Sequence, residues 1–149
     1  MTNKFMQVAI ECAMKASNIN EIPVGAVITL NSNIIATSYN YVQNGKNAVF
    51  HAEMLAIISA CQYLSSKTLV NCDLYTTLEP CYMCLGAIAN AKIRRLYIGC
   101  EDERYGGVLN GLQVFKNGNI NHKPEIYCGI MEDECKKIIQ DFFQKLRNK

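Results

Sequence analysis

Residues 75–84 read Tyr75-Thr76-Thr77-Leu78-Glu79-Pro80-Cys81-Tyr82-Met83-Cys84, and this stretch decides the fold. Residues 72–77 are rich in β-forming side chains and predict a strand. Pro80 suits the opening of a helix over residues 81–91, because its missing N–H would be unpaired there anyway. A strand that passes directly into a helix is typical of a layered α/β domain.

The rest of the chain continues this alternation of helices and strands. Two strands, at residues 23–30 and 33–39, are joined by the tight turn Asn31-Ser32 and predict a hairpin. Residues 101–122 contain several glycines and predict a loop. The other expected elements are helices at 5–16 (capped by Thr2 or Asn3), 52–64 and 132–146, and strands at 94–99 and 125–128. This order predicts an α/β fold.

A second motif, His51-Ala52-Glu53, also opens a predicted helix. Cys81 and Cys84 are three residues apart, so both sulfurs point to the same side of the first helical turn. The positive end of the helix dipole favours their thiolate forms. Two thiolates and one imidazole leave one position of a tetrahedral Zn²⁺ open, which indicates a catalytic metal site with ligands His51, Cys81 and Cys84.

Glu53 is expected to be the catalytic residue of this site. His51 and Glu53 are two residues apart and diverge on a helix, which leaves the carboxylate free for proton transfer. Two thiolates cancel the formal charge of Zn²⁺, so the ion should acidify water less than one held by three neutral histidines. We therefore expect Glu53 to take a proton from attacking water and to return protons to the substrate and to its leaving group.

Simpler explanations exist for each part of the motif. A Cys-x-x-Cys pair can be a redox site, although such a site does not need a His-x-Glu elsewhere. A structural zinc would need a fourth ligand, from His122 or one of Cys72, Cys100 and Cys128. A single histidine often belongs to the core. We expect the cysteines outside the motif to pack as small hydrophobic side chains: Cys12, Cys61, Cys72, Cys100, Cys128 and Cys135.

Composition is that of an ordinary globular protein. Of 149 residues, 50% are hydrophobic and 19% are charged, and the net charge of +2 argues against a strongly basic, nonspecific nucleic-acid binder. We expect one domain over residues 1–149, reduced cysteines and a cytoplasmic location, because neither a signal peptide nor a membrane-spanning run is evident. Residues 136–149 are basic and could contact phosphate or simply face solvent.

The pattern His-x-Glu…Pro-Cys-x-x-Cys is that of zinc-dependent deaminases. The chain resembles the bacterial tRNA-specific adenosine deaminases of the cytidine deaminase-like superfamily over nearly its whole length. The shared residues are Glu21-Ile22-Pro23-Val24-Gly25-Ala26-Val27, Asn40, His51-Ala52-Glu53, Thr77-Leu78-Glu79-Pro80-Cys81-Tyr82-Met83-Cys84-Leu85-Gly86-Ala87, Asp102, Asn121-His122 and Asp141-Phe142-Phe143.

The resemblance implies a three-layer α/β/α fold with a central mixed sheet of about five strands. It implies hydrolysis of adenosine to inosine at the wobble position of a tRNA anticodon, with an arginine tRNA as the expected substrate. It also implies one Zn²⁺ per subunit and a homodimer that does not associate with membranes. Asn40 would then hydrogen-bond the flipped-out base, Asp102 and Asn121 would lie along the anticodon-loop groove, and Phe143 with its neighbour Phe142 would flank that groove.

One segment departs from the family pattern. Where the family usually has small residues, this chain has Glu103-Arg104-Tyr105, which with Glu101 and Asp102 makes a locally acidic loop. Such a loop is a poor phosphate cradle unless Arg104 dominates, which leaves the RNA contacts and the substrate range open. The alternatives are a guanine or cytosine deaminase of the same superfamily, a non-catalytic RNA-binding protein and a thiol redox protein.

Overall fold

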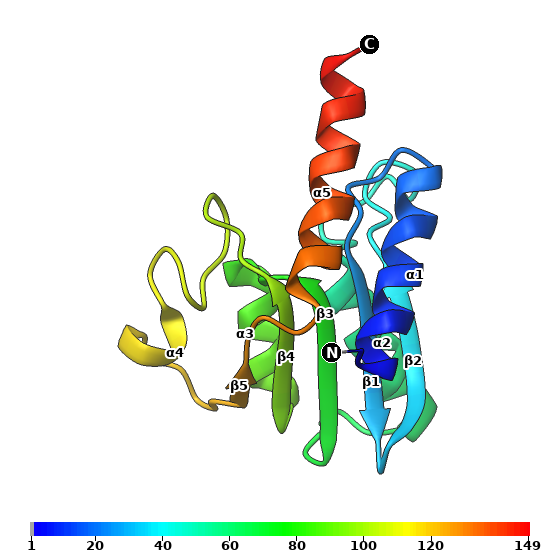
Figure 1. Ribbon diagram of the computed structural model, residues 1–149. Helices are drawn as coiled ribbons and strands as arrows, with labels where there is room; N and C mark the ends of the chain where they lie inside the picture. The colour runs from blue at the N-terminus through cyan, green and yellow to red at the C-terminus, as the bar shows by residue number, and fades with distance from the viewer. Residues whose placement is uncertain (1) are drawn as a thin grey trace.

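A five-stranded sheet with helices on both faces forms the centre of the molecule. The computed structural model describes residues 2–149 (Figure 1). In chain order the elements are α1 (Lys4–Asn18), β1 (Gly25–Leu30), β2 (Asn33–Tyr39), α2 (Ala52–Leu64), β3 (Cys72–Leu78), α3 (Tyr82–Ala91), β4 (Arg95–Cys100), α4 (Val114–Asn117), β5 (Glu125–Tyr127) and α5 (Glu132–Arg147). The predicted three-layer α/β/α fold with a mixed sheet is confirmed.

The strand order places two helix N-termini at the same end of the sheet. The order is β2-β1-β3-β4-β5, with β1 antiparallel to both β2 and β3, and with β3, β4 and β5 parallel. Strands β2 and β3 therefore run in the same direction. Helix α2 follows β2 and helix α3 follows β3. Both helices therefore begin at the same end of the sheet, beyond the C-terminal ends of these two strands. The two halves of the sequence motif thus meet in space.

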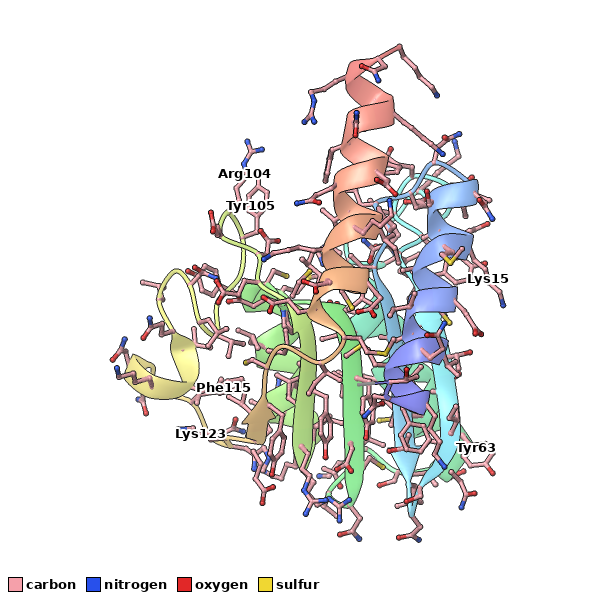
Figure 2. All side chains as sticks on the ribbon, viewed as in Figure 1. Lys15, Tyr63, Arg104, Tyr105, Phe115 and Lys123 are labelled. Atoms are coloured by element: carbon pink, nitrogen blue, oxygen red, sulfur yellow. The ribbon has the colours of Figure 1, made fainter. Side chains whose placement is uncertain are left out.

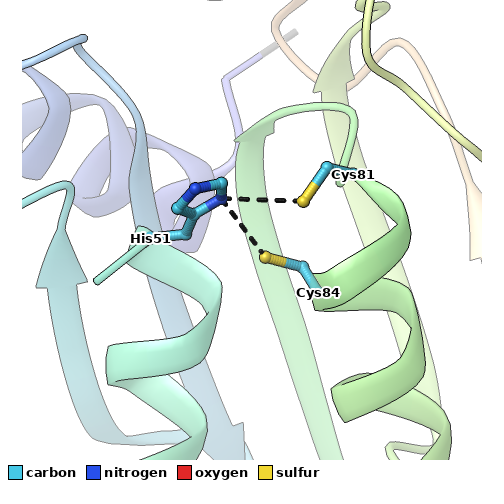
Figure 3. Close-up of side chains that lie close together, drawn as sticks. All are labelled: His51, Cys81 and Cys84. Carbon is cyan, nitrogen blue, oxygen red and sulfur yellow. Dashed lines mark hydrogen bonds between the residues drawn. The ribbon is translucent and has the colours of Figure 1, made fainter. Parts of the chain in front are cut away.

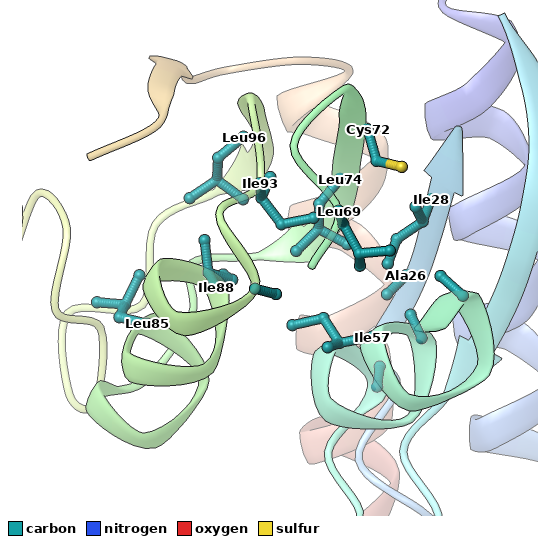
Figure 4. Close-up of a cluster of buried hydrophobic side chains, with 14 of the residues drawn as sticks. Ala26, Ile28, Ile57, Leu69, Cys72, Leu74, Leu85, Ile88, Ile93 and Leu96 are labelled. Carbon is teal, nitrogen blue, oxygen red and sulfur yellow. The ribbon is translucent and has the colours of Figure 1, made fainter. Parts of the chain in front are cut away.

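Alternation along the strands divides the buried side chains between two cores. Ala26, Ile28 and Leu74 face α2 and α3 and belong to the larger apolar cluster (Figure 4). Val27 and Tyr75 point to the opposite face and pack in a smaller cluster with residues of α1 and α5. Successive residues of a strand therefore pack against different helix layers, one on each face of the sheet.

The predicted elements are confirmed, with ends that differ by one or two residues. Asn3 is the cap of α1, and its Oδ1 accepts hydrogen bonds from the N–H groups of Phe5 and Met6 at 3.0 and 2.9 Å. The segment 101–122 was predicted as a loop because of its glycines, but it contains one short helix, α4. No helix in residues 2–149 is long and apolar enough to cross a membrane.

The cysteines outside the motif were expected to pack as small hydrophobic side chains. Four of them are buried and Cys61 is half-buried, as expected, but Cys128 is exposed, because it follows the edge strand β5 where no helix covers it. The buried four are Cys12, Cys72, Cys100 and Cys135.

Candidate active site

The two halves of the motif are held by the first turns of α2 and α3. His51 is the N-cap residue of α2 and Cys81 that of α3, and both have extended backbone angles. Neither side chain caps its own helix, so both are free to point into the space between the helices. Pro80 lies one residue before the cap rather than inside the helix, and Cys84 completes the first turn.

His51, Cys81 and Cys84 lie close enough together to hold a metal ion (Figure 3). Nδ1 of His51 lies 3.6 Å from Sγ of Cys81 and 3.7 Å from Sγ of Cys84. A tetrahedral Zn²⁺ with ordinary bond lengths separates a nitrogen and a sulfur ligand by about 3.6 Å. The donor types and their spacing therefore fit such an ion. Within residues 2–149 no fourth histidine, cysteine or carboxylate joins the group, so the fourth ligand of a structural zinc is not present.

The sulfurs are prepared to bind a cation. A hydrogen bond from the Cys84 thiol lowers the pKa of Cys81 to about 4, with His51 acting in the same direction, and the same bond raises the pKa of Cys84. The contact with Cys81 also raises the pKa of His51. The low pKa of Cys81 favours its thiolate form beside the imidazole, and a bound divalent cation would displace the thiol proton of Cys84.

Glu53 lies beside this group and is almost completely buried. Its residue exposure is 4%, and its Oε1 accepts a hydrogen bond of 2.9 Å from Oγ1 of Thr76 on β3. Burial raises the pKa of Glu53, whereas hydrogen bonds from Cys84 and Thr76 act in the opposite direction. A carboxyl with a raised pKa that is fixed by a neighbouring hydroxyl suits both accepting and returning a proton.

A cavity of about 670 Å³ opens above these residues. His51, Glu53 and Cys81 line it, together with residues of the loop after β4 and of α5. Its volume is in the range of pockets that take small organic ligands. His51 and Cys81 are therefore accessible to a molecule that enters from solvent.

Asn40 also lines the cavity, where it supports the opening of α2. Its Oδ1 accepts a hydrogen bond of 2.8 Å from the N–H of Ala52, one of the first N–H groups of α2 that have no partner within the helix. The amide Nδ2 is not used by this bond. Asn40 can therefore support the helix and donate a hydrogen bond to a ligand at the same time.

Of the other predicted substrate-binding residues, two line the cavity and one does not. Asp102 and Phe143 line the cavity from the loop after β4 and from α5. Asn121 is exposed near β5 and does not line the cavity, because α4 and the turns around it carry this residue away from the helix N-termini. Residue spacing along the chain contains no information on the direction that this loop takes.

Two buried carboxylates were not predicted as part of the site. Glu79 accepts hydrogen bonds from the N–H groups of Asp102, Val108, Leu109 and Asn110 at 2.9–3.2 Å, and from Nδ2 of Asn110 at 2.7 Å. It therefore anchors the loop that forms one cavity wall.

Glu21 anchors the opposite wall, with bonds from the N–H groups of Gln43 and Asn44 at 3.1 and 2.7 Å. Both residues belong to the segments shared with the deaminase family, but the sequence indicates no particular hydrogen-bond partner for either carboxylate.

Comparison with known proteins assigns this site to a family. The MafB19-like deaminase family matches residues 2–147. The tRNA-specific adenosine deaminase of Rickettsia typhi is 42% identical over 145 residues, which cover 96% of this chain and 98% of that protein. The chain belongs to the tRNA-specific adenosine deaminase family. It is accordingly a hydrolytic deaminase.

Solved structures agree with this family. One comes from a study of A-to-I editing by tRNA:A34 deaminases at the wobble position of transfer RNA. It has a TM-score of 0.89 and 40% identity, covering 91% of this chain and 98% of that one. A guanine deaminase from Bacillus subtilis is 38% identical with a TM-score of 0.63, covering 68% of this chain and 66% of that one. The fold of this deaminase family thus also occurs in enzymes of free bases.

Proposed function

We propose that the chain hydrolyses adenosine to inosine at the wobble position of a tRNA anticodon, with an arginine tRNA as its first substrate. The observation that carries this proposal is the position of Glu53 beside the ligand set His51, Cys81 and Cys84 at the floor of one cavity. Membership of the tRNA-specific adenosine deaminase family supports the substrate class. We further propose that residues 1–149 make up one catalytic domain.

His51, Cys81 and Cys84 would hold one Zn²⁺ per subunit. When bound, the ion supplies Lewis-acid activation of a water molecule at its open position. The protein contributes the ligand geometry, because two of the three donor residues, His51 and Cys81, are the N-cap residues of α2 and α3. Ligands held on two helix N-termini that are packed on one sheet need little rearrangement on binding.

Glu53 would move the protons of the reaction. Its carboxylate accepts one proton of the attacking water and passes it to the ring nitrogen of the base. It then takes the second proton from the same oxygen, now bonded to the base, and delivers it to the amino group, so that the C–N bond breaks, ammonia leaves and the C=O bond forms. Thr76 holds Oε1 in place, so the carboxylate keeps its direction through both transfers. Burial of Glu53 excludes bulk water, which would otherwise compete for the proton.

Asn40 would position the base. The hydrogen bond to Ala52 uses only the Oδ1 atom of Asn40. The Nδ2 group can therefore donate a hydrogen bond to a ring nitrogen of the flipped-out adenine. Asp102 and Phe143 would contact nucleotides of the anticodon loop at the cavity wall, and Asn121 would contact the RNA outside the cavity. A cytoplasmic homodimer without membrane association completes the proposal, and it rests on the family resemblance.

Inosine formation tests this function directly. Zinc-loaded protein should convert an anticodon stem-loop with adenosine at the wobble position to the inosine form, detected by mass spectrometry of digested RNA. Glu53→Gln should form inosine at least about 100-fold more slowly. Total tRNA treated with the protein would identify which tRNAs are edited.

The guanine deaminase among the structural relatives makes a free-base deaminase the second candidate. The stem-loop assay separates the two activities when guanine and cytosine are supplied in parallel. Consumption of either free base with an unchanged stem-loop would overturn the tRNA proposal in favour of this alternative.

A further inference from the structure

A tight turn directly after β4 presents two side chains at the rim of the cavity. Oδ1 of Asp102 accepts hydrogen bonds of 3.1 Å from the N–H groups of both Arg104 and Tyr105. The backbone of Asp102 is held in turn by Glu79, through a bond of 3.2 Å to its N–H. The position of Tyr105 is therefore fixed by a chain of hydrogen bonds that begins at a buried carboxylate.

Tyr105 is a large aromatic side chain that the fold leaves uncovered. It lines the same cavity as His51 and Glu53, yet 61% of the residue is exposed. The guanidinium of Arg104 lies over its ring, 5.2 Å from the centroid (Figure 2). This cation–π contact restrains the ring while most of its surface stays in contact with solvent.

The charge of this loop restricts what it can bind. Glu101, Asp102 and Glu103 precede Arg104, the only cation of residues 101–105. A run of carboxylates repels phosphate groups, so the loop is a poor partner for an RNA backbone. The face of a nucleobase carries no charge and is the part of an RNA that an aromatic ring beside acidic residues can bind.

A target base that enters the cavity leaves its neighbouring nucleotides at the rim. The target base must reach the floor near Glu53, so the nucleotides on either side of it leave the base stack of the loop and pass the rim. Tyr105 forms the rim on one side, and Phe143 and Leu146 of α5 line the cavity from another element. Proteins commonly bind such unstacked bases by stacking them on aromatic side chains.

We infer that Tyr105 is a specificity-determining residue, whose ring stacks on the base of the nucleotide adjacent to the target adenosine. This inference rests on the proposed function and names a contact within it. Arg104 orients the ring from one side, and the base covers the exposed surface. The contact selects RNAs in which that neighbouring base can leave the stack of the loop.

The test compares substitutions at Tyr105 on an anticodon stem-loop. Tyr105→Ala should raise KM for the stem-loop on the order of tenfold, with kcat at saturation nearly unchanged. Tyr105→Phe should restore the wild-type KM, because the ring and not the hydroxyl makes the contact. Tyr63→Ala is the matched control, since Tyr63 is 69% exposed and lies at the opposite end of the molecule (Figure 2).

A second set of RNAs identifies the stacking partner. In these stem-loops the nucleotide on one or the other side of the target adenosine is abasic. With one of the two RNAs, the wild type and Tyr105→Ala should have equal KM values, because the base that stacks is missing. An unchanged KM in Tyr105→Ala, a Tyr105→Phe variant as impaired as Tyr105→Ala, or a full effect with both abasic RNAs would each overturn the inference.

Failure of the proposed function would give a different result. Dissociation constants measured by fluorescence anisotropy in a Glu53→Gln background do not depend on turnover. If the wild type forms no inosine, the function is wrong, while the loss of affinity in Tyr105→Ala would still support the contact. If inosine forms but the dissociation constant does not respond to Tyr105, only the stacking inference fails.

Discussion

Asn40 and Ala52 are joined by a hydrogen bond of 2.8 Å from the Ala52 N–H to the Asn40 side-chain oxygen. The bond connects the end of the hairpin to the first turn of the helix that carries Glu53. A side chain from outside the helix thus satisfies one N–H at its start, while His51, turned toward the sulfurs, makes no capping bond. In the proposed function, support of the helix and substrate binding would be combined in one amide, and substitutions can separate them.

Asn40→Asp should retain the cap and lose the base contact. The carboxylate still accepts from Ala52, so the melting temperature should stay near that of the wild type, while activity falls because the Nδ2 donor is missing. Asn40→Ala should lose both and cost about 1 kcal/mol of stability. Thermal unfolding and inosine kinetics on the same samples measure the two effects, and equal melting temperatures for both variants would contradict the capping role.

The zinc content of variants should distinguish the proposed metal ligands from the proposed catalytic carboxylate of Glu53. Cys81→Ser and Cys84→Ser should lose zinc and melt at a lower temperature, because bound metal stabilises only the folded state. Glu53→Gln should keep one zinc per chain and lose at least about 100-fold in kcat. Elemental analysis of the purified variants measures this, and metal-free Glu53→Gln protein would mean that the glutamate is itself a ligand.

Glu79→Gln should destabilise the cavity wall. Its two oxygens accept five hydrogen bonds, and an amide nitrogen in place of one oxygen would face N–H groups that it cannot satisfy. We expect a loss of about 2–3 kcal/mol, seen as a lower melting temperature and as faster proteolysis within residues 101–113.

Glu125→Gln is the matched control, because Glu125 pairs with Arg95 on an exposed part of the sheet and its loss should hardly change the melting temperature. Equal melting temperatures for the two variants would show that the buried carboxylate does not anchor the loop.

Glu21 should make stability depend on pH in the acid range. Burial acts to raise the pKa of Glu21, but the N–H groups of Asn44 and Gln43 outweigh it and lower the pKa below the ordinary 4.5. Because the folded-state pKa is the lower one, this stabilisation is present above pH 4.5 and is lost as the pH falls through the folded-state pKa. Urea unfolding of the wild type and Glu21→Gln from pH 7 to pH 3 should show a difference in stability that shrinks on acidification, whereas a constant difference would rule this out.

The sequence by itself determined the helices and strands, and it predicted the chemistry of the site. Alternating and helical spacing predicted the main helices and strands, and the spacing of Cys81 and Cys84 placed both sulfurs on one side of a helical turn, because these are local properties of the chain. The donor types His51, Cys81 and Cys84 predicted the metal, and the separation of Glu53 from them predicted its role in proton transfer.

Only the tertiary structure decided what surrounds that chemistry. The antiparallel position of β1 between β2 and β3 brought the starts of α2 and α3 together, and no local pattern encodes which strands are neighbours. The anchoring role of Glu79, the exposed ring of Tyr105 at the rim and the position of Asn121 outside the cavity depend on the path of a long loop. That path is fixed by hydrogen bonds between residues more than twenty positions apart, which periodicity along the sequence does not reveal.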